Sequence, residues 1–129
     1  MRKPAPPRDL PPPLELECLQ SLWRLGEGNV RVVREDLANA GRPLAYTTVM
    51  TLLDRLARRG AVSRTKRGRC FFYLPQLNRD QALSYALEEM ARTFFAGSRA
   101  GLQSYIAGDG TALVVGEGAA EEDLDITLL

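Results

Sequence analysis

Hydrophobic residues recur at helical spacing through the first half of the chain, and compact strand-forming runs follow. This spacing predicts three short helices, at about residues 14–25, 31–40 and 47–59. Two strand-forming segments, residues 61–65 and 70–74, come next, and the turn Lys66–Arg69 between them contains Gly68, which tolerates a positive φ. Two further helices are expected at about residues 78–96 and 98–107. The pattern predicts a mainly α fold with one small β-hairpin.

The third predicted helix has one apolar face and one polar face. At 100° per residue the apolar face gathers Val49, Leu52, Leu53 and Leu56. The opposite face carries Thr47, Thr51, Asp54 and Arg58, flanked by Thr48 and Arg55. We expect the apolar face in the core and the polar face open to a partner.

Positive charge is concentrated from the second half of this helix to the turn between the two strands. Residues 55–69 contain seven Lys and Arg side chains and no carboxylate. A charge run at a helix end is often only a solvated face, and Arg58 and Arg59 would suit the negative end of the helix in that way. Solvated faces usually mix signs, however, so the whole run favours a surface for phosphates.

Three short helices followed by a basic hairpin describe a winged helix-turn-helix, in which the third helix enters the major groove of DNA. We therefore predict that double-stranded DNA is the partner. The expected DNA-binding residues are Thr47, Thr48, Thr51, Arg55, Arg58, Arg64, Lys66, Arg67 and Arg69. Asp54 has two open interpretations: it pairs with Arg58 one turn on, or it accepts a hydrogen bond from a cytosine.

The helices after residue 77 carry a second set of apolar positions. They either cover the core of the monomer or form a homodimer interface, and the second is favoured because so large a patch is unusual on a soluble monomer. The expected interface residues are Leu83, Leu87, Met90, Phe94, Phe95, Leu102, Tyr105 and Ile106. A two-fold dimer would match a palindromic, inverted-repeat operator.

Composition narrows the chemistry. The 129 residues are 45% hydrophobic and include no histidine, no phosphate-cradling glycine loop and no suitably spaced pair of carboxylates, so we expect no enzymatic activity, metal or cofactor. Cys18 and Cys70 are both interpreted as small buried hydrophobic residues in a reducing compartment. With no membrane span and no signal peptide expected, the predicted location is cytoplasmic.

Charge and proline content divide the chain into four parts. Residues 1–13 hold six of the eight prolines and are expected to be a disordered leader. Residues 14–76 are the predicted winged helix, with 11 Lys and Arg against 6 Asp and Glu, and residues 77–107 the dimerisation helices. Residues 108–129 have 6 acidic side chains and no basic one, and are expected to be a weakly ordered tail.

Three stretches closely resemble the penicillinase-repressor family of bacterial transcription regulators, the BlaI/MecI type. They are ELECLQSLW at 15–23, YTTVMTLLDRLARRG at 46–60 and VSRTKRGRCFFYLP at 62–75. The resemblance implies a homodimeric repressor that occupies an inverted repeat over a promoter, often of β-lactamase or related genes. It also implies that Thr47, Thr48, Thr51 and Arg55 face DNA, that residues 66–69 form the wing, and that C-terminal helices hold the dimer.

The chain departs from the family pattern after residue 103. In the best-known family members a regulatory protease, triggered by a membrane sensor, cuts the repressor at a site that aligns near Ser104 and Tyr105, but these residues do not reproduce the family's cleavage pair. The final amphipathic helix and the C-terminal cysteine cluster of copper-responsive relatives are also missing. An alternative function is a winged-helix protein-interaction module, which would present an apolar rather than a basic third helix.

Overall fold

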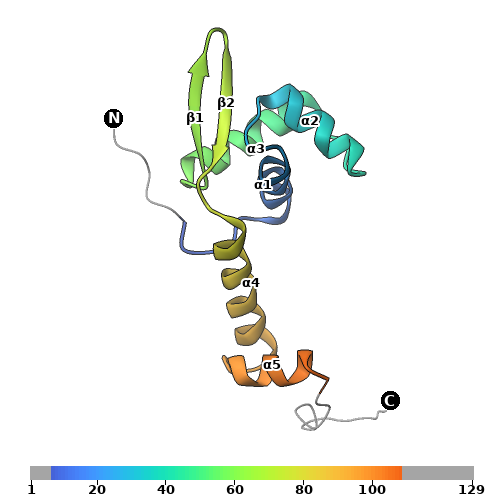
Figure 1. The fold of residues 1–129 in the computed structure, drawn as a ribbon, viewed down its shortest axis with the longest axis vertical. Helices are drawn as coiled ribbons and strands as arrows, with labels where there is room; N and C mark the ends of the chain where they lie inside the picture. Colours follow the sequence, from blue (N-terminus) through green and yellow to red (C-terminus); the bar gives the residue numbers. More distant parts are fainter. Residues whose placement is uncertain (1–6, 109–129) are drawn as a thin grey trace. The chain divides into compact units, whose positions relative to one another are not determined.

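The computed structural model describes residues 7–108, which form five helices and one two-stranded antiparallel hairpin (Figure 1). In chain order these are α1 (Pro13–Leu25), α2 (Val30–Asn39), α3 (Tyr46–Arg58), β1 (Val62–Arg67), β2 (Cys70–Pro75), α4 (Arg79–Phe94) and α5 (Arg99–Ile106). The predicted class, mainly α with a small hairpin, is confirmed. The chain divides into two compact units, the first ending at Tyr85 and the second beginning at Ala86.

The core of the first unit lies where α1, α2 and α3 pack on one another and on the base of the hairpin. All four apolar positions predicted for the third helix are buried, as are Leu19 and Leu22 of α1 and Val33 and Leu37 of α2. Burying each such side chain contributes roughly 1.5–3 kcal/mol, which orients the amphipathic helices. The polar face of α3 is thereby turned outward.

Local sequence fixes where these helices begin and end. Gly26 closes α1 with a φ of +88°, and its N–H donates to the carbonyl of Leu22. The side chain of Asn29 then accepts a hydrogen bond of 2.9 Å from the Val32 N–H and caps α2. No side chain caps α3, which begins one residue before the predicted Thr47.

The hairpin is longer than the sequence indicated. Its register pairs Val62 with Pro75 and Arg67 with Cys70, so Lys66 and Arg67 lie in strand β1 and the tip contains only Gly68 and Arg69. Gly68 has a φ of +63°, as the tight turn requires. Gly28 exchanges two backbone hydrogen bonds with Tyr73, at 3.1 and 2.8 Å. The loop between α1 and α2 therefore holds the hairpin at its middle.

The described part of the proline-rich leader packs on the first unit. Pro7 and Pro11 are buried, and Leu10 lies against the core. The Tyr85 hydroxyl donates a 3.0 Å hydrogen bond to the carbonyl of Pro7. Residues 7–11 thus contact the folded unit, and the disordered leader at residues 1–13 stays a prediction.

In the second unit, α4 ends two residues before the predicted position. Ala96 and Gly97 both have positive φ, at 51° and 85°, and they end α4 in a turn before Ser98 caps α5. Leu102 and Ala91 are buried here, and the rings of Phe95 and Tyr105 lie 6.0 Å apart. The predicted tail, apart from Gly108, lies outside the described residues.

Candidate nucleic-acid interface

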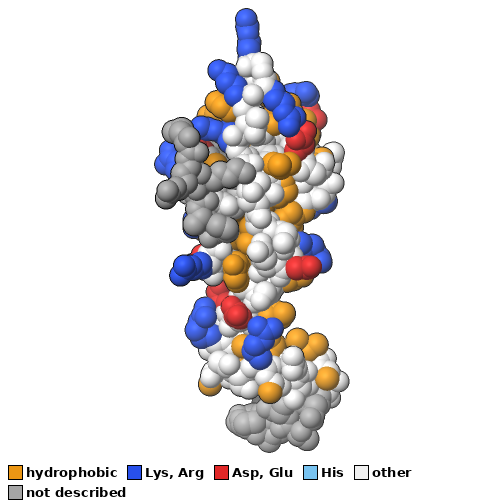
Figure 2. Space-filling view, turned by 60° about the vertical axis from the view of Figure 1, so that its left-hand side comes forward, with side chains coloured by type: hydrophobic (Ala, Val, Ile, Leu, Met, Phe, Trp, Pro, Cys, Tyr) orange, Lys and Arg blue, Asp and Glu red, His pale blue; other side chains and the backbone are white. Residues whose placement is uncertain are grey.

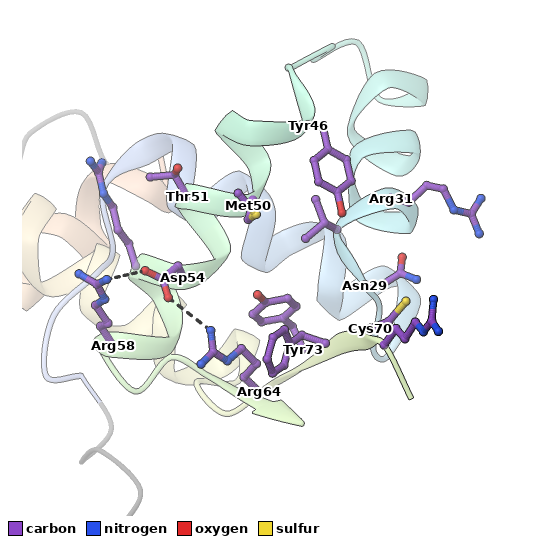
Figure 3. A pocket seen from close by; sticks show the side chains of 14 residues that line it. Asn29, Arg31, Tyr46, Met50, Thr51, Asp54, Arg58, Arg64, Cys70 and Tyr73 are labelled. Carbon is purple, nitrogen blue, oxygen red and sulfur yellow. Dashed lines mark ion pairs between the residues drawn. The ribbon is translucent and has the colours of Figure 1, made fainter. Parts of the chain in front are cut away.

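A groove of about 740 Å³ opens between α3, the start of α2 and the hairpin (Figure 3). All three elements belong to the first unit. Fourteen residues line the groove: Asn29, Val30, Arg31, Tyr46, Met50, Thr51, Asp54, Arg55, Arg58, Arg64, Arg69, Cys70, Phe71 and Tyr73. Five of these are arginines and one is a carboxylate, so the groove has a strongly cationic rim.

The five α3 residues predicted to face DNA are all exposed. Thr51, Arg55 and Arg58 line the groove, whereas Thr47 and Thr48 lie outside its lining, on the first turn of the helix. The helix thus presents hydroxyls at its start and guanidinium groups along the groove. Both kinds of group donate hydrogen bonds to phosphates and base edges.

Folding neutralises several of the seven cations that the sequence places together. Arg59 donates to Glu15 on α1 through Nε at 2.7 Å and Nη2 at 3.3 Å, and Glu15 is only 3% exposed. This arginine therefore joins α1 to the end of α3, and its side chain is only 35% exposed. Hydrogen bonding to Glu15 raises the pKa of Arg59 above its already high usual value.

On the hairpin, Arg67 is likewise engaged. Its two terminal nitrogens donate to the Glu27 carboxylate at 2.8 Å each, in a bidentate pair across the loop that precedes α2. The hydrogen bond from Arg67 lowers the pKa of Glu27, so both groups stay charged at neutral pH. Arg67 also lies 4.7 Å from the ring centroid of Phe72. In this structure Arg67 therefore ties the hairpin to the loop between α1 and α2.

Three of the seven cations keep their charge uncompensated. Within residues 7–108, Arg55, Lys66 and Arg69 make no ion pair, while Arg58 and Arg64 share the carboxylate of Asp54. Figure 2 shows several Lys and Arg side chains in the upper part of the view, around the hairpin, and others lower down. The uncompensated groups come from α3, β1 and the hairpin tip, so they lie along the two elements that border the groove.

The floor of the groove includes apolar side chains that the sequence analysis did not select. Tyr46, Met50 and Phe71 are 46%, 43% and 40% exposed. Tyr46 and Met50 are one turn apart on α3, beside the predicted polar face. Helical spacing in the sequence was therefore enough to place both side chains next to the expected DNA-binding residues. Asn29 and Arg31, at the start of α2, also line the groove, and no local pattern indicated this.

The prediction that both cysteines are buried is wrong for Cys70. Cys18 is buried between the helices, where burial, with added repulsion from Glu17 and Glu15, raises its pKa to about 12. Cys70 is exposed and lines the groove. The aromatic residues after it suggested an apolar site, but Cys70 is the first residue of β2, next to the tip of the hairpin.

Most of the residues predicted for a dimer interface are open to solvent. On α4, Leu83 is 43% exposed, Met90 45% and Phe94 75%, and on α5, Tyr105 is 52% and Ile106 66% exposed. Leu87 and Phe95 are half-buried. Leu102 differs, because at 3% exposure it packs inside the second unit and offers no surface.

The described residues offer little support for other kinds of site. No three His, Cys, Asp or Glu side chains within residues 7–108 come together as a group that would hold a metal ion. None of the helices in that part of the chain combines the length and apolarity needed to cross a membrane.

Three packed helices, a β-hairpin and a cation-rimmed groove between them define a winged helix-turn-helix protein. The comparison with known proteins identifies the particular group. The chain belongs to the penicillinase repressor family, whose model matches residues 12–110.

Individual relatives agree with this assignment. The transcriptional regulator BlaI of Mycobacterium tuberculosis is 39% identical over 88 residues, which are 67% of this chain and 63% of that protein. This chain thus spans less than two thirds of that relative's length. The penicillinase repressor of Bacillus licheniformis is 26% identical over 84 residues, 65% of each chain.

Solved structures show the same fold. The DNA-binding domain of the repressor BlaI superposes with a TM-score of 0.51 and 26% identity, covering 60% of this chain and 93% of that domain. The hsRosR-S4 complex structure gives a TM-score of 0.51 at 21% identity, covering 82% of this chain and 94% of that one, and supports the fold alone.

Proposed function

We propose that this protein is a DNA-binding transcriptional repressor that acts as a homodimer on an inverted-repeat operator. The observation that carries the proposal is the groove between α3 and the hairpin, with its five arginines and its exposed threonine, on the fold of the penicillinase repressor family. The relatives are transcriptional regulators and a penicillinase repressor by name, so we extend the proposal to β-lactamase-type or related genes as targets.

In the proposed complex, α3 enters the major groove, which is wide enough for one helix. Thr51, Arg55 and Arg58 reach base edges or adjacent phosphates, and the start of the helix offers Thr47 and Thr48. Lys66 and Arg69 contact the backbone from the wing. Tyr46 and Met50 supply apolar contact to sugars and thymine methyl groups.

The homodimer rests on the exposed apolar side chains after residue 82. Large contiguous apolar surface is rare on soluble monomers and marks an interaction site. Figure 2 shows hydrophobic side chains open to solvent over the lower part of the chain, where α4 and α5 lie. A second copy would cover Met90, Phe94, Tyr105 and Ile106. We accordingly propose residues 14–76 as the DNA-binding part and 77–107 as the dimerisation part.

We propose that release of this repressor from DNA does not depend on proteolysis. Ser104 and Tyr105 lie within α5, so a protease would first have to unwind this helix, and the two residues differ from the family's cleavage pair.

The DNA-binding part of the proposal is tested with Arg55→Ala. If Arg55 reads a base, the substitution should weaken binding to the selected operator by roughly 1–3 kcal/mol and relax selectivity at one base pair. Arg79→Ala removes the same charge outside the groove and serves as the control. Fluorescence anisotropy at several salt concentrations gives both affinity and salt dependence. Equal affinity of Arg55→Ala and the parent would exclude the assigned role of α3.

The dimer is tested with Phe94→Asp. A charge on this 75%-exposed ring should be incompatible with a dry interface, so the chain should sediment as a monomer at micromolar concentration. The neighbouring Thr93→Asp adds the same charge at an exposed polar position and should remain dimeric. Circular dichroism confirms that both variants fold. A dimeric Phe94→Asp variant would exclude this interface.

A protein-interaction module is the second candidate, because Tyr46 and Met50 give α3 an exposed apolar strip beside its cations. Such a module would not bind double-stranded oligonucleotides at low ionic strength. Tight, salt-sensitive binding to duplex DNA would exclude it as the main function.

A further inference from the structure

Asp54 is the one carboxylate among the residues that line the groove. It lies on α3, in the middle of the face that turns away from the core, and its side chain is 34% exposed. A carboxylate at this place repels phosphate and lowers the affinity of the surface for any nucleic acid. Because Asp54 lies among five arginines and weakens binding to phosphate, we expect its role to lie in something other than affinity for DNA.

The two oxygens of Asp54 hold two arginines from different elements (Figure 3). Oδ2 lies 2.9 Å from Nη2 of Arg58, one turn further along α3, and Oδ1 lies 3.6 Å from Nη1 of Arg64 on β1. The guanidinium of Arg64 is also held against Phe71, at 4.4 Å from the ring centroid. Asp54 thus links the third helix to the wing across the groove.

This link limits where the two guanidinium groups can go. Without Asp54, each long arginine side chain could follow whichever phosphate lies nearest. With Asp54, the guanidinium groups of Arg58 and Arg64 favour positions beside the same carboxylate. A duplex that offers a base edge and a phosphate at those positions therefore binds best. Pre-orienting long side chains in this way raises discrimination, because a mismatched duplex leaves a charged group unpaired.

We propose that Asp54 is a specificity-determining residue, which lowers affinity for DNA in general and raises selectivity by fixing Arg58 and Arg64 relative to each other. This inference rests on the proposed DNA-binding function. It assigns Asp54 a positioning role, exerted through the two arginines.

The test compares Asp54→Asn with the parent on two duplexes. One is selected by the parent protein from a random double-stranded pool, and the other is a shuffled sequence of the same length and composition. We expect the variant to bind the shuffled duplex about fivefold more tightly, the effect of removing one like-charge contact at roughly 4 Å in water. The ratio of affinities for the two duplexes should fall about tenfold, as for the loss of one oriented arginine contact.

Two further variants make the result specific. Asp80→Asn removes the same charge from the first turn of α4, outside the groove, and should leave the ratio unchanged. Asp54→Asn combined with Arg64→Gln should lower the ratio no further than the more severe single variant, because both substitutions break the same link. Thermal unfolding of each variant shows whether the domain itself has been weakened.

The possible results separate the two proposals. A parent that prefers its selected duplex and an Asp54→Asn variant with the same ratio would overturn the inference and leave the proposed function standing. Loss of affinity for both duplexes by a common factor would overturn it equally, since that result means a structural role. A parent that ignores both duplexes at low ionic strength would overturn the proposed function, and the inference with it.

Discussion

Arg58 and Arg59 are neighbours at the end of α3, and the structure gives them opposite roles. Arg58 is 79% exposed and pairs with Asp54 on the helix surface, whereas the Arg59 side chain is 35% exposed and pairs with the 4%-exposed side chain of Glu15. We predict that Arg59→Gln lowers the stability of the fold and that Arg58→Gln changes mainly the interaction with DNA. The two substitutions are chemically identical and one residue apart.

The expected size of the effect follows from burial. Removing one partner of a buried ion pair typically costs about 3–5 kcal/mol, because the other charge is left buried without compensation. The Arg59 side chain is about one-third exposed, so water can partly solvate Glu15 once the guanidinium is removed. We therefore expect a loss of about 2–3 kcal/mol in the free energy of unfolding, below the range for a fully buried pair. For a unit of this size the melting temperature should fall by roughly 10–20 °C. The exposed pair of Arg58 contributes only ~0.3–0.5 kcal/mol.

The assay is thermal unfolding followed by circular dichroism, with the parent, both single variants and Glu15→Gln/Arg59→Gln. In the double variant no charge is left buried, so it should regain part of the lost stability. The hydrogen bond with Glu15 raises the pKa of Arg59, so its contribution to stability is fully present at any pH below the usual pKa of arginine. The difference between the two variants should therefore persist through neutral and mildly alkaline pH. Equal melting temperatures for Arg58→Gln and Arg59→Gln would refute the reasoning.

Three further predictions follow from single positions. A thiol reagent should label one cysteine in the native protein and two after unfolding, because Cys70 is exposed while burial raises the pKa of Cys18 to about 12 and keeps it protonated; Cys70→Ser should abolish native labelling. Gly26→Ala should lower the free energy of unfolding by ~1–2 kcal/mol from backbone strain alone, since φ is +88° and a Cβ there would meet no atom within 4 Å; an unchanged urea midpoint would argue against it. Trp23→Phe should cost ~1 kcal/mol or more, because the indole Nε1 donates to the carbonyl of Leu77 at 3.0 Å, and the same urea titration measures this loss.

The helices and their buried faces could be predicted from the sequence because both depend on neighbours three and four residues apart. Val49, Leu52, Leu53 and Leu56 had to share one face of any helix that contains them, and a core was the only place for that face. The hairpin was also predicted, but its first strand extends further than expected, since backbone pairing continues to Arg67, where the apolar pattern has already ended. After Val62, β1 consists of polar residues only, so nothing in the sequence marked where this strand ends.

Charge compensation could not be predicted, because the partners are remote in sequence. Glu15 precedes Arg59 by 44 residues, and Glu27 precedes Arg67 by 40. A run of seven cations without a carboxylate therefore looked like one continuous surface, whereas packing brings acidic side chains from α1 and its following loop onto it. The same limitation explains Cys70, whose apolar neighbours in sequence are not its surroundings in the fold.

The sequence by itself determined the order of elements, the inward face of each core helix and the concentration of positive charge in one region, since these properties depend on local spacing and composition. Only the tertiary structure decided which of those charges remain uncompensated, that Asp54 joins the third helix to the wing, and that Leu102 is core while Phe94 is surface. The physical reason is that ion pairing and burial depend on atoms brought within a few ångströms by packing, and this proximity is not encoded by distance along the chain.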